Sequence, residues 1–247
     1  EFRAGLFDPL YSEEYAKQLW WHQQYHGNNG LLRLQEWHDI GLEVYRNFDL
    51  GPVSVPAYFY LLNGDDSSTF ILDSYNYVDN NGGMSGLVHI APEFQVPFLS
   101  RFRLMGSFGY GKWDREDEND AYKTALGIDM GLKSVTLMSE YMYKKFEDIP
   151  LTGTGVADGE QEGYYIKGLW DITNKWRMVA KFSHAELYEV QDTMLTDTYD
   201  SYSFGINYFV TDSSTIMPQI AYTDADRSDG SEELEYYRFT LGWRTTF

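Results

Sequence analysis

The sequence predicts an all-β protein: a transmembrane antiparallel up-and-down β-barrel of about 12 strands, with residues 1–247 forming a single domain. Three observations support this fold. About twelve segments alternate apolar and polar residues, which is the period of a strand. Short and long connections between these segments alternate strictly along the chain. In the clearest segments, all basic residues fall on one face, opposite an apolar and aromatic face.

Composition narrows the class of protein. A formal net charge of −19 makes non-specific nucleic-acid binding very unfavourable. The chain has no cysteine, which excludes a disulfide scaffold and a thiolate metal site. No apolar run approaches the roughly 20 residues that a membrane helix needs. We therefore expect a β-rich protein without nucleic-acid partners, cofactors or metal ions.

The first half of the chain contains five predicted strands. A short strand leads into a long connection, in which Ser12 followed by two acidic residues is a favourable helix start, and we expect a helix as far as His26. A tight turn at 49–52 joins the second and third strands. The fourth has a proline, Pro92, near its end. The five strands cover residues 1–7, 37–48, 53–62, 83–94 and 101–112.

The second half contains seven strands. Lys133-Ser134 is a two-residue turn of the kind found in β-hairpins. The strands cover residues 121–132, 135–145, 163–172, 176–187, 202–210, 214–223 and 234–247. Short connections fall at 49–52, 95–99, 133–134, 173–175 and 211–213, and long ones at 8–34, 63–82, 113–120, 146–161, 189–200 and 224–233. Short turns at one end and longer loops at the other are typical of outer-membrane barrels.

The basic residues determine which face of each strand meets lipid. A lysine or arginine on the lipid face near the bilayer midplane costs about 2–4 kcal/mol. In the last strand, one register would place Arg238 and Arg244 in lipid, whereas the other places neither there. The same reasoning predicts that the pore is lined by Arg3, Arg101, Arg103, Lys123, Lys144, Lys167, Arg177, Lys181, Arg238 and Arg244.

The predicted wall also carries acidic residues, namely Asp39, Glu43, Glu93, Asp129, Glu140 and Asp171. Two interpretations remain open. The excess of basic groups could form rings that select anions. Alternatively, the basic groups could pair with the acidic groups across strands and make the wall rigid.

The connection 8–34 is the most unusual. Its aromatic residues, including Trp20 and Trp21, favour a loop that folds into the lumen and narrows it, with 63–82 as the second candidate. His22 and His26 have helical i,i+4 spacing that can bind a metal ion, but they lie outside any HExxH pattern. A surface or packing role is therefore favoured over a metal site.

The remaining negative charge lies in the connections and at the strand ends. Acidic residues at these places would form a rim around the barrel. This rim is either a solvated surface or a site where divalent cations bridge to outer-membrane lipid or lipopolysaccharide. The acidic rim comprises Asp65, Asp66, Asp114, Glu116, Asp117, Glu118, Asp120, Asp224, Asp226, Asp229, Glu232 and Glu233.

The stretch Phe2–Glu14 resembles a segment of the phosphate-selective porin O/P family, in which a strand runs into a proline and a glutamate before an inward-folded loop. The matching residues are Arg3, Gly5, Phe7, Pro9 and Glu13 or Glu14. The next strand, from Asp39, looks like the following strand of that family. The terminal Phe247, after alternating aromatic residues, resembles the terminal signature that barrel-insertion machinery reads. The resemblance implies a sixteen-stranded barrel with about four strands before Glu1, and it makes 8–34 the constricting loop. A dense arginine ladder is missing, so a general porin is expected rather than a phosphate-specific one.

We expect a multi-pass protein of the outer membrane: a porin, not an enzyme, that lets small hydrophilic solutes, anions included, diffuse passively. One alternative is a barrel that encloses a docked partner protein, and a homotrimer is also open. Another is a barrel hydrolase, for which His89 and His184 are candidates without an obvious partner in the sequence. A soluble binding protein is the remaining possibility.

Overall fold

The computed structural model describes residues 1–16, 30–35, 37, 39–63, 83–112, 119–150, 156–190, 194–227 and 234–245. These residues form one antiparallel sheet of thirteen strands and two short helices, so the all-β prediction is confirmed. The strands are β1 (Phe2–Phe7), β2 (Asp39–Asp49), β3 (Val53–Leu62), β4 (Ser85–Ile90), β5 (Glu93–Phe94), β6 (Arg101–Lys112), β7 (Asp120–Leu132), β8 (Val135–Pro150), β9 (Val156–Thr173), β10 (Trp176–Val190), β11 (Met194–Thr211), β12 (Ser214–Arg227) and β13 (Leu234–Thr245).

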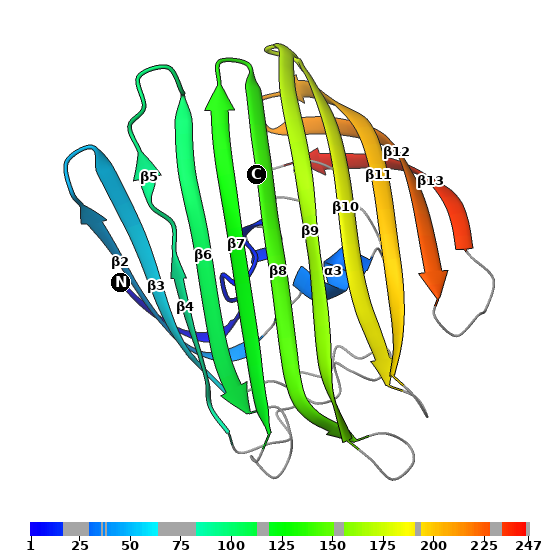
Figure 1. Cartoon of the computed structure of the whole chain (residues 1–247). Helices are drawn as coiled ribbons and strands as arrows, with labels where there is room; N and C mark the ends of the chain where they lie inside the picture. The colour runs from blue at the N-terminus through cyan, green and yellow to red at the C-terminus, as the bar shows by residue number, and fades with distance from the viewer. Residues whose placement is uncertain are drawn as a thin grey trace.

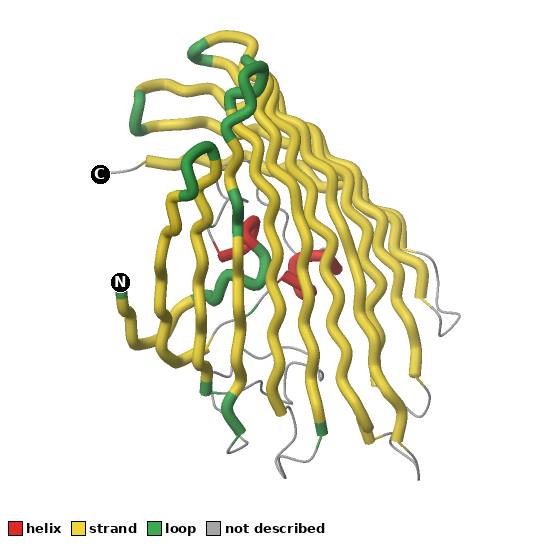
Figure 2. The backbone as a smooth tube through the Cα atoms, turned by 60° about the vertical axis from the view of Figure 1, so that its left-hand side comes forward, coloured by secondary structure: helices red, strands yellow, loops and turns green. Residues whose placement is uncertain are grey.

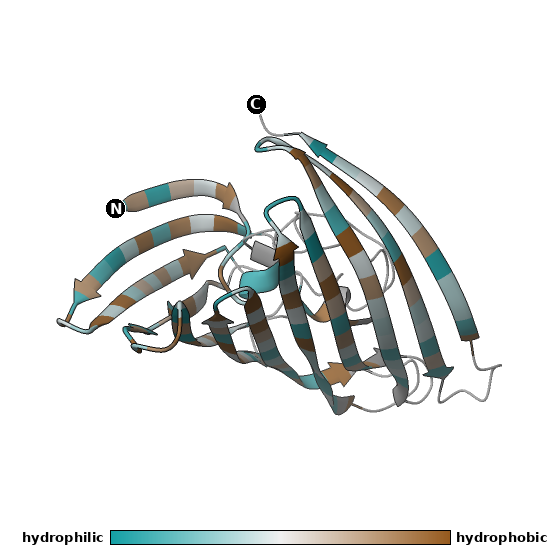
Figure 3. Ribbon diagram, turned by 90° about the horizontal axis from the view of Figure 1, so that it is seen from above, coloured by the Kyte–Doolittle hydropathy of each residue, from teal (hydrophilic) through white to brown (hydrophobic). Residues whose placement is uncertain are grey.

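The strands follow one another in space in the order of the sequence, and the short β5 pairs with β3 and β6 beside the main path (Figure 1). Among the described residues, β1 pairs with β2 and β13 with β12, so these two strands form the edges of the sheet. The sheet is strongly curved, and Figure 3 shows it from above as an arc with the two edge strands at its ends. The up-and-down order of the prediction is therefore observed, in a sheet that curls without completing a ring.

Several strands and turns have the bounds that the sequence predicts. Strands β3 and β6 begin and end at the expected residues. The hairpin between β7 and β8 has the expected two-residue turn, in which Lys133 has a φ of 50°. Positive φ values are typical of the turns that join two strands this tightly.

Other connections are shorter than predicted. The expected loops 146–161 and 189–200 are largely strand, because β8 continues to Pro150 and β9 begins at Val156, while β10 reaches Val190. These stretches are rich in Asp, Glu, Gly and Thr, a composition typical of loops. Pairing with neighbouring strands continues the ladder through them nevertheless, as in Phe146↔Gly159 and Glu189↔Leu195. The predicted loop 224–233 is shortened in the same way, because β12 ends at Arg227.

The predicted strand 83–94 is interrupted. It divides into β4 and β5 around Pro92, which has no N–H to donate to the ladder. The carbonyl of Pro92 still accepts a hydrogen bond from the N–H of Leu104, at 3.0 Å. The break is therefore local, and the sheet continues on both sides of it.

Two short helices, α1 (Glu13–Ala16) and α3 (Gly30–Gln35), lie on the concave side of the sheet (Figure 2). Helix α1 starts after Ser12, as predicted, and α3 was not predicted. The remainder of the predicted helix, including Trp20, Trp21, His22 and His26, lies outside the described residues, as does most of 63–82. In the part of the chain that is described, no helix is long and apolar enough to cross a membrane.

The core lies between these helices and the concave face. Leu31 and Leu34 of α3 pack with Tyr165 of β9 and with Leu187 of β10. Helix α3 approaches the sheet at Gly163, where an added Cβ would lie 2.7 Å from the carbonyl oxygen of His184 and about 3 Å from both leucines. Only glycine leaves enough room for this contact. The buried part of the cluster is Leu10, Tyr11, Leu31, Leu34, Trp37, Tyr60, Leu62, Leu87, Ala125, Met138, Met142, Tyr165, Leu169, Val179, Ala185 and Leu187.

Candidate functional site on the concave face

The concave face carries a cluster of buried charges where the segment 8–16 crosses it. Ser12, Glu13 and Glu14 are each at most 1% exposed, although they belong to a connection between strands. Their partners come from β4, β6, β8, β9 and β10. Burying this much charge is unfavourable unless every group is paired, so the pairing defines the site.

Glu140 of β8 anchors the start of α1. One oxygen of its carboxylate accepts the backbone N–H of Glu13 at 2.9 Å, and the other accepts the hydroxyl of Ser12 at 2.9 Å and the N–H of Glu14 at 3.3 Å. The hydroxyl of Tyr165 donates to the same carboxylate at 3.0 Å. The first N–H groups of a helix lack partners within the helix, and here a residue from a distant strand satisfies them.

Glu14 joins two lysines. Its carboxylate accepts hydrogen bonds from Lys167 at 2.5 Å, from Lys181 at 2.7 Å and from the side-chain amide of Gln35 in α3 at 2.8 Å. Burial raises the pKa of Glu14, but the charges of Lys167 and Lys181 outweigh that effect and, with Gln35, hold the pKa well below the usual range. Glu14 is therefore an anion in the folded protein.

Glu13 makes the second pair of contacts. Its carboxylate accepts a hydrogen bond from the guanidinium of Arg103 and lies 3.1 Å from Nε2 of His89. The other ring nitrogen of His89 lies 2.8 Å from Oγ of Ser107, whose hydroxyl donates to the carbonyl of Leu10 at 3.0 Å. Both ring nitrogens of His89 therefore lie within hydrogen-bond distance of a side-chain oxygen.

Ser107, His89 and Glu13 have the composition of a nucleophile–base–acid triad. His89 therefore has the spatial partners that its sequence neighbours did not reveal. A catalytic serine must reach its substrate and give its proton to the histidine. Here Ser107 is 6% exposed, and its proton is directed to the carbonyl of Leu10. This geometry suits a structural role, in which Ser107 and His89 hold the segment 8–16 against the sheet.

Two further lysines lie against aromatic rings of the connection between β1 and β2, whose described residues on the concave side we call the inward segment (8–16, 30–35 and 37). Lys123 of β7 and Lys144 of β8 are opposite each other in the register, and both are buried. The ammonium of Lys123 lies 3.6 Å from the ring centroid of Trp37, and that of Lys144 lies 5.4 Å from the ring of Tyr11. Cation–π contacts of this kind stabilise cations that have left bulk water.

Strand register places several of these groups at one level. One continuous row crosses eight strands of the concave face, from β6 to β13. We call this set the basic row, because it holds four cations and one anion. It consists of Arg103, Asp129, Met138, Lys167, Lys181, Ser203, Ala221 and Arg238.

All ten residues predicted to line a pore are described, and at least six of them pair with carboxylates. Arg101 and Arg103 lie 3.0 Å and 3.7 Å from Asp129, and Arg177 donates to Asp171 at 2.6 Å. Arg3 lies 3.7 Å from Glu43. Lys167 and Lys181 pair with Glu14, as above. Most of the predicted basic residues therefore pair with acidic groups, and this favours the interpretation in which such pairs make the wall rigid.

The sequence did not identify Glu13 and Glu14 as members of the wall. Their signals were their position after Ser12 at a helix start, the match of one of them to the glutamate of the porin O/P segment, and an unexplained excess of basic residues on the strands. The partners of Glu14 lie 153 and 167 residues away in the chain. No local pattern connects residues over that separation.

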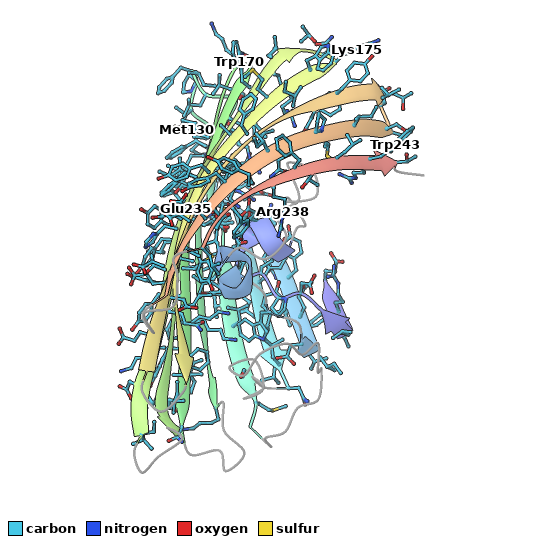
Figure 4. All side chains as sticks on the ribbon, turned by 90° about the vertical axis from the view of Figure 1, so that its right-hand side faces the viewer. Met130, Trp170, Lys175, Glu235, Arg238 and Trp243 are labelled. Atoms are coloured by element: carbon cyan, nitrogen blue, oxygen red, sulfur yellow. The ribbon has the colours of Figure 1, made fainter. Side chains whose placement is uncertain are left out.

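The convex face has the opposite character. It exposes large apolar side chains, among them Phe239 at 80% and Trp243 at 72%. Figure 4 labels Glu235 and Arg238 on opposite sides of β13, with Arg238 on the side of the two helices. The other exposed large apolar residues of the long strands β6 to β13 include Leu104, Phe108, Leu126, Leu137, Tyr141, Ile166, Trp170, Tyr202, Phe204, Ile220, Tyr237 and Leu241.

Aromatic rings form rows across neighbouring strands of this convex face. The longer row joins Phe182, Tyr202, Tyr222 and Tyr237, with ring centroids 4.9 to 6.4 Å apart. Nearer the short turns, Trp176 and Tyr208 lie 4.4 Å apart. Two other tyrosines of this face donate to carboxylates: Tyr110 to Asp120 at 2.7 Å and Tyr141 to Glu162 at 2.5 Å.

The acidic rim is only partly described. Asp120, Asp224 and Asp226 belong to strands, whereas Asp65, Asp66, Asp114, Glu116, Asp117, Glu118, Asp229, Glu232 and Glu233 lie outside the described residues. Within the described ranges, no group of three or more His, Asp or Glu side chains could hold a metal ion.

Comparison with known proteins gives no identification, since no family model matches the chain and neither does any curated protein.

Proposed function

We propose that this protein is an outer-membrane porin, whose sheet belongs to a transmembrane β-barrel and whose concave face lines a passage for small hydrophilic solutes. The supporting observation is the separation of the two faces. Charged groups lie on the concave face and are paired there, while the convex face exposes aromatic and aliphatic residues along eight consecutive strands. An apolar surface this extensive is unfavourable in water and favourable in lipid.

The dimensions of the strands agree with a membrane crossing. Outward-facing residues of β7 run from Tyr122 to Leu132 and include Leu126, Ile128 and Met130. Ten residue steps span roughly 33 Å along a strand, or about 25 Å at the tilt of about 40° that is common in barrels. That is the height of the apolar band of an outer-membrane barrel, and the Trp176–Tyr208 pair, at the turn end of β10, lies where such a barrel carries an aromatic girdle.

The proposal includes closure of the sheet into a complete ring, in which the edge strands β1 and β13 have neighbours. A lipid-exposed strand edge leaves main-chain groups without partners in hydrocarbon, so β1 and β13 need neighbours there. The resemblance of Phe2–Glu14 to the phosphate-selective porin O/P family supports additional strands between these two edges, to a total of sixteen. The inward segment, which includes α1 and α3, then narrows the lumen.

The test is electrical. The protein, purified in detergent and added to planar lipid bilayers, is expected to produce discrete, ohmic conductance steps. Failure to insert, or insertion without ohmic current, would overturn the porin proposal. Insertion together with stoichiometric co-purification of another protein would favour the docking barrel instead.

A further inference from the structure

The convex face has a hollow where its row of large side chains is interrupted. Gly168 of β9 and Ala180 of β10 are register partners on this face, and they form the floor of the hollow. In the same row they lie between Leu137 of β8 and Phe204 of β11, which are 45% and 40% exposed. The hollow has a volume of about 580 Å³. Its lining also includes Ile166, Phe182, Tyr202 and Tyr237.

Packing within the sheet does not require the missing side chain at Gly168. A Cβ added there would make an ordinary contact 3.7 Å from Leu137, whereas at Gly163 of the same strand it would lie 2.7 Å from a carbonyl oxygen. Glycine is also unfavourable inside a strand, because it loses more conformational entropy on folding and has no side chain to pack. The chain therefore keeps open a hollow that its own packing does not need.

The position of the hollow fits the acyl chain of a lipid whose headgroup lies at the short turns. Ala180 is four residues beyond Trp176 in β10, which is roughly 10 Å higher at a strand tilt of about 40°. That height falls in the turn-side half of an apolar band about 25 Å tall. Lys175 is exposed in the turn just below, and Figure 4 labels it at the same end of the sheet as Trp170.

Lys175 supplies a positive charge for the headgroup. Asp171, close to it in the sequence, pairs with Arg177 at 2.6 Å, and within the described ranges no ion pair engages Lys175. The short turns on either side carry Lys133 and Asp212, whose charges offset each other. A lysine at the edge of the apolar band can extend its ammonium to the lipid phosphates, and such lysines favour anionic lipids.

A second copy of the chain is a poorer occupant than a lipid. A stable protein–protein interface takes roughly 20–30 residues a side, whereas eleven residues line the hollow. A single flexible hydrocarbon chain needs only a short apolar depression. The lining is mostly apolar and aromatic, which suits hydrocarbon.

We propose that this hollow binds one acyl chain of a glycerophospholipid, while Lys175 holds the anionic headgroup at the turn end of β10. The inference goes beyond the passage of solutes and rests on the membrane-spanning part of the proposed function. It assigns a lipid site to one place on the outer surface of the sheet.

The experiment uses native mass spectrometry to count the phospholipid that stays with detergent-purified protein after incubation with phosphatidylglycerol. Wild-type protein should retain one molecule. Gly168→Leu fills the floor and should lower retention roughly tenfold, as loss of contact for about two methylene groups predicts. The matched control is Gly106→Leu, which should retain lipid like the wild type. Gly106 is a glycine of β6 outside the hollow, and its Cβ would also lie 3.7 Å from a leucine, Leu126.

Lys175→Gln tests the headgroup contact at an exposed turn, where the fold is not at risk. It should lower the affinity for phosphatidylglycerol about fivefold, the share expected of one basic residue beside an anionic lipid, and leave the affinity for phosphatidylcholine unchanged. An equal loss for both lipids, or no loss, would contradict the role of Lys175.

Equal retention by Gly168→Leu and Gly106→Leu would overturn the inference, as would wild-type protein that retains no lipid. Ohmic conductance of the same preparation would in either case leave the porin proposal standing. Lipid retained at this site by a protein that inserts without ohmic current would support the lipid site and overturn the porin proposal alone.

Discussion

The carboxylate of Glu140 accepts the backbone N–H of Glu13 at 2.9 Å, across 127 residues of sequence. This contact fixes the position of α1 against β8. From there Glu13 reaches Arg103, and Glu14 reaches Lys167 and Lys181. Glu140 therefore helps to position the two carboxylates that pair with basic residues of the concave face.

Glu140→Leu should release the inward segment. The substitution removes the acceptor for two backbone N–H groups and for the hydroxyls of Ser12 and Tyr165, and each buried donor left unsatisfied costs about 1–3 kcal/mol. Limited proteolysis should cleave the variant between residues 8 and 35 faster than the wild type. Equal cleavage rates would show that Glu140 does not hold the segment, and Glu162→Gln serves as the control.

The pairing of Glu14 predicts a loss of stability in acid. Because its pKa in the folded protein lies below the ordinary value of about 4.3, its charge stabilises the fold fully above that pH, and the contribution is lost as the pH falls further. The free energy of unfolding in detergent should decrease from about pH 5 downward, and less steeply in Glu14→Gln. Parallel pH profiles for the two proteins would contradict this role.

Gly163 should be intolerant of a side chain. Gly163→Ala would bring a methyl group into contact with the carbonyl of His184 and with Leu31 and Leu34, which must displace α3 or β10 at a cost of about 1–3 kcal/mol. Gly168→Ala, in the same strand, is the control, since its Cβ would make an ordinary contact 3.7 Å from Leu137. Chemical denaturation of both variants measures the difference, and equal stabilities would contradict the close packing of α3.

The strand faces were predictable from the sequence because they depend on alternation, which is local. Arg238 and its neighbours in β13 needed only the period of two to be assigned to the face opposite Phe239. The partners of Arg103, Lys167 and Lys181 were not predictable in this way. They are Glu13 and Glu14, whose location depends on how a long connection folds across five strands. Strand lengths were underestimated for β9 and β11 because a polar composition hid ladders that pairing sustains.

A lysine test distinguishes the two faces energetically. Phe239→Lys places a charge on the convex face near the middle of β13 and should destabilise the protein in lipid vesicles by about 2–4 kcal/mol. Thr240→Lys, one residue further on the concave face, should cost much less. Guanidinium titrations of both variants in the same vesicles provide the comparison, and similar losses for both would argue against a lipid-facing convex surface.

The most direct test of the central claim, that the concave face lines a water-filled passage and the convex face meets lipid, uses the absence of cysteine from the chain. Thr136→Cys and Leu137→Cys introduce single thiols at adjacent positions of β8, the first half-buried on the concave face and the second exposed on the convex face. In bilayers, a charged water-soluble thiol reagent should react with Thr136→Cys and reduce its conductance, while Leu137→Cys is unaffected. Reaction at Leu137→Cys with Thr136→Cys protected, or equal reaction at both, would contradict the account.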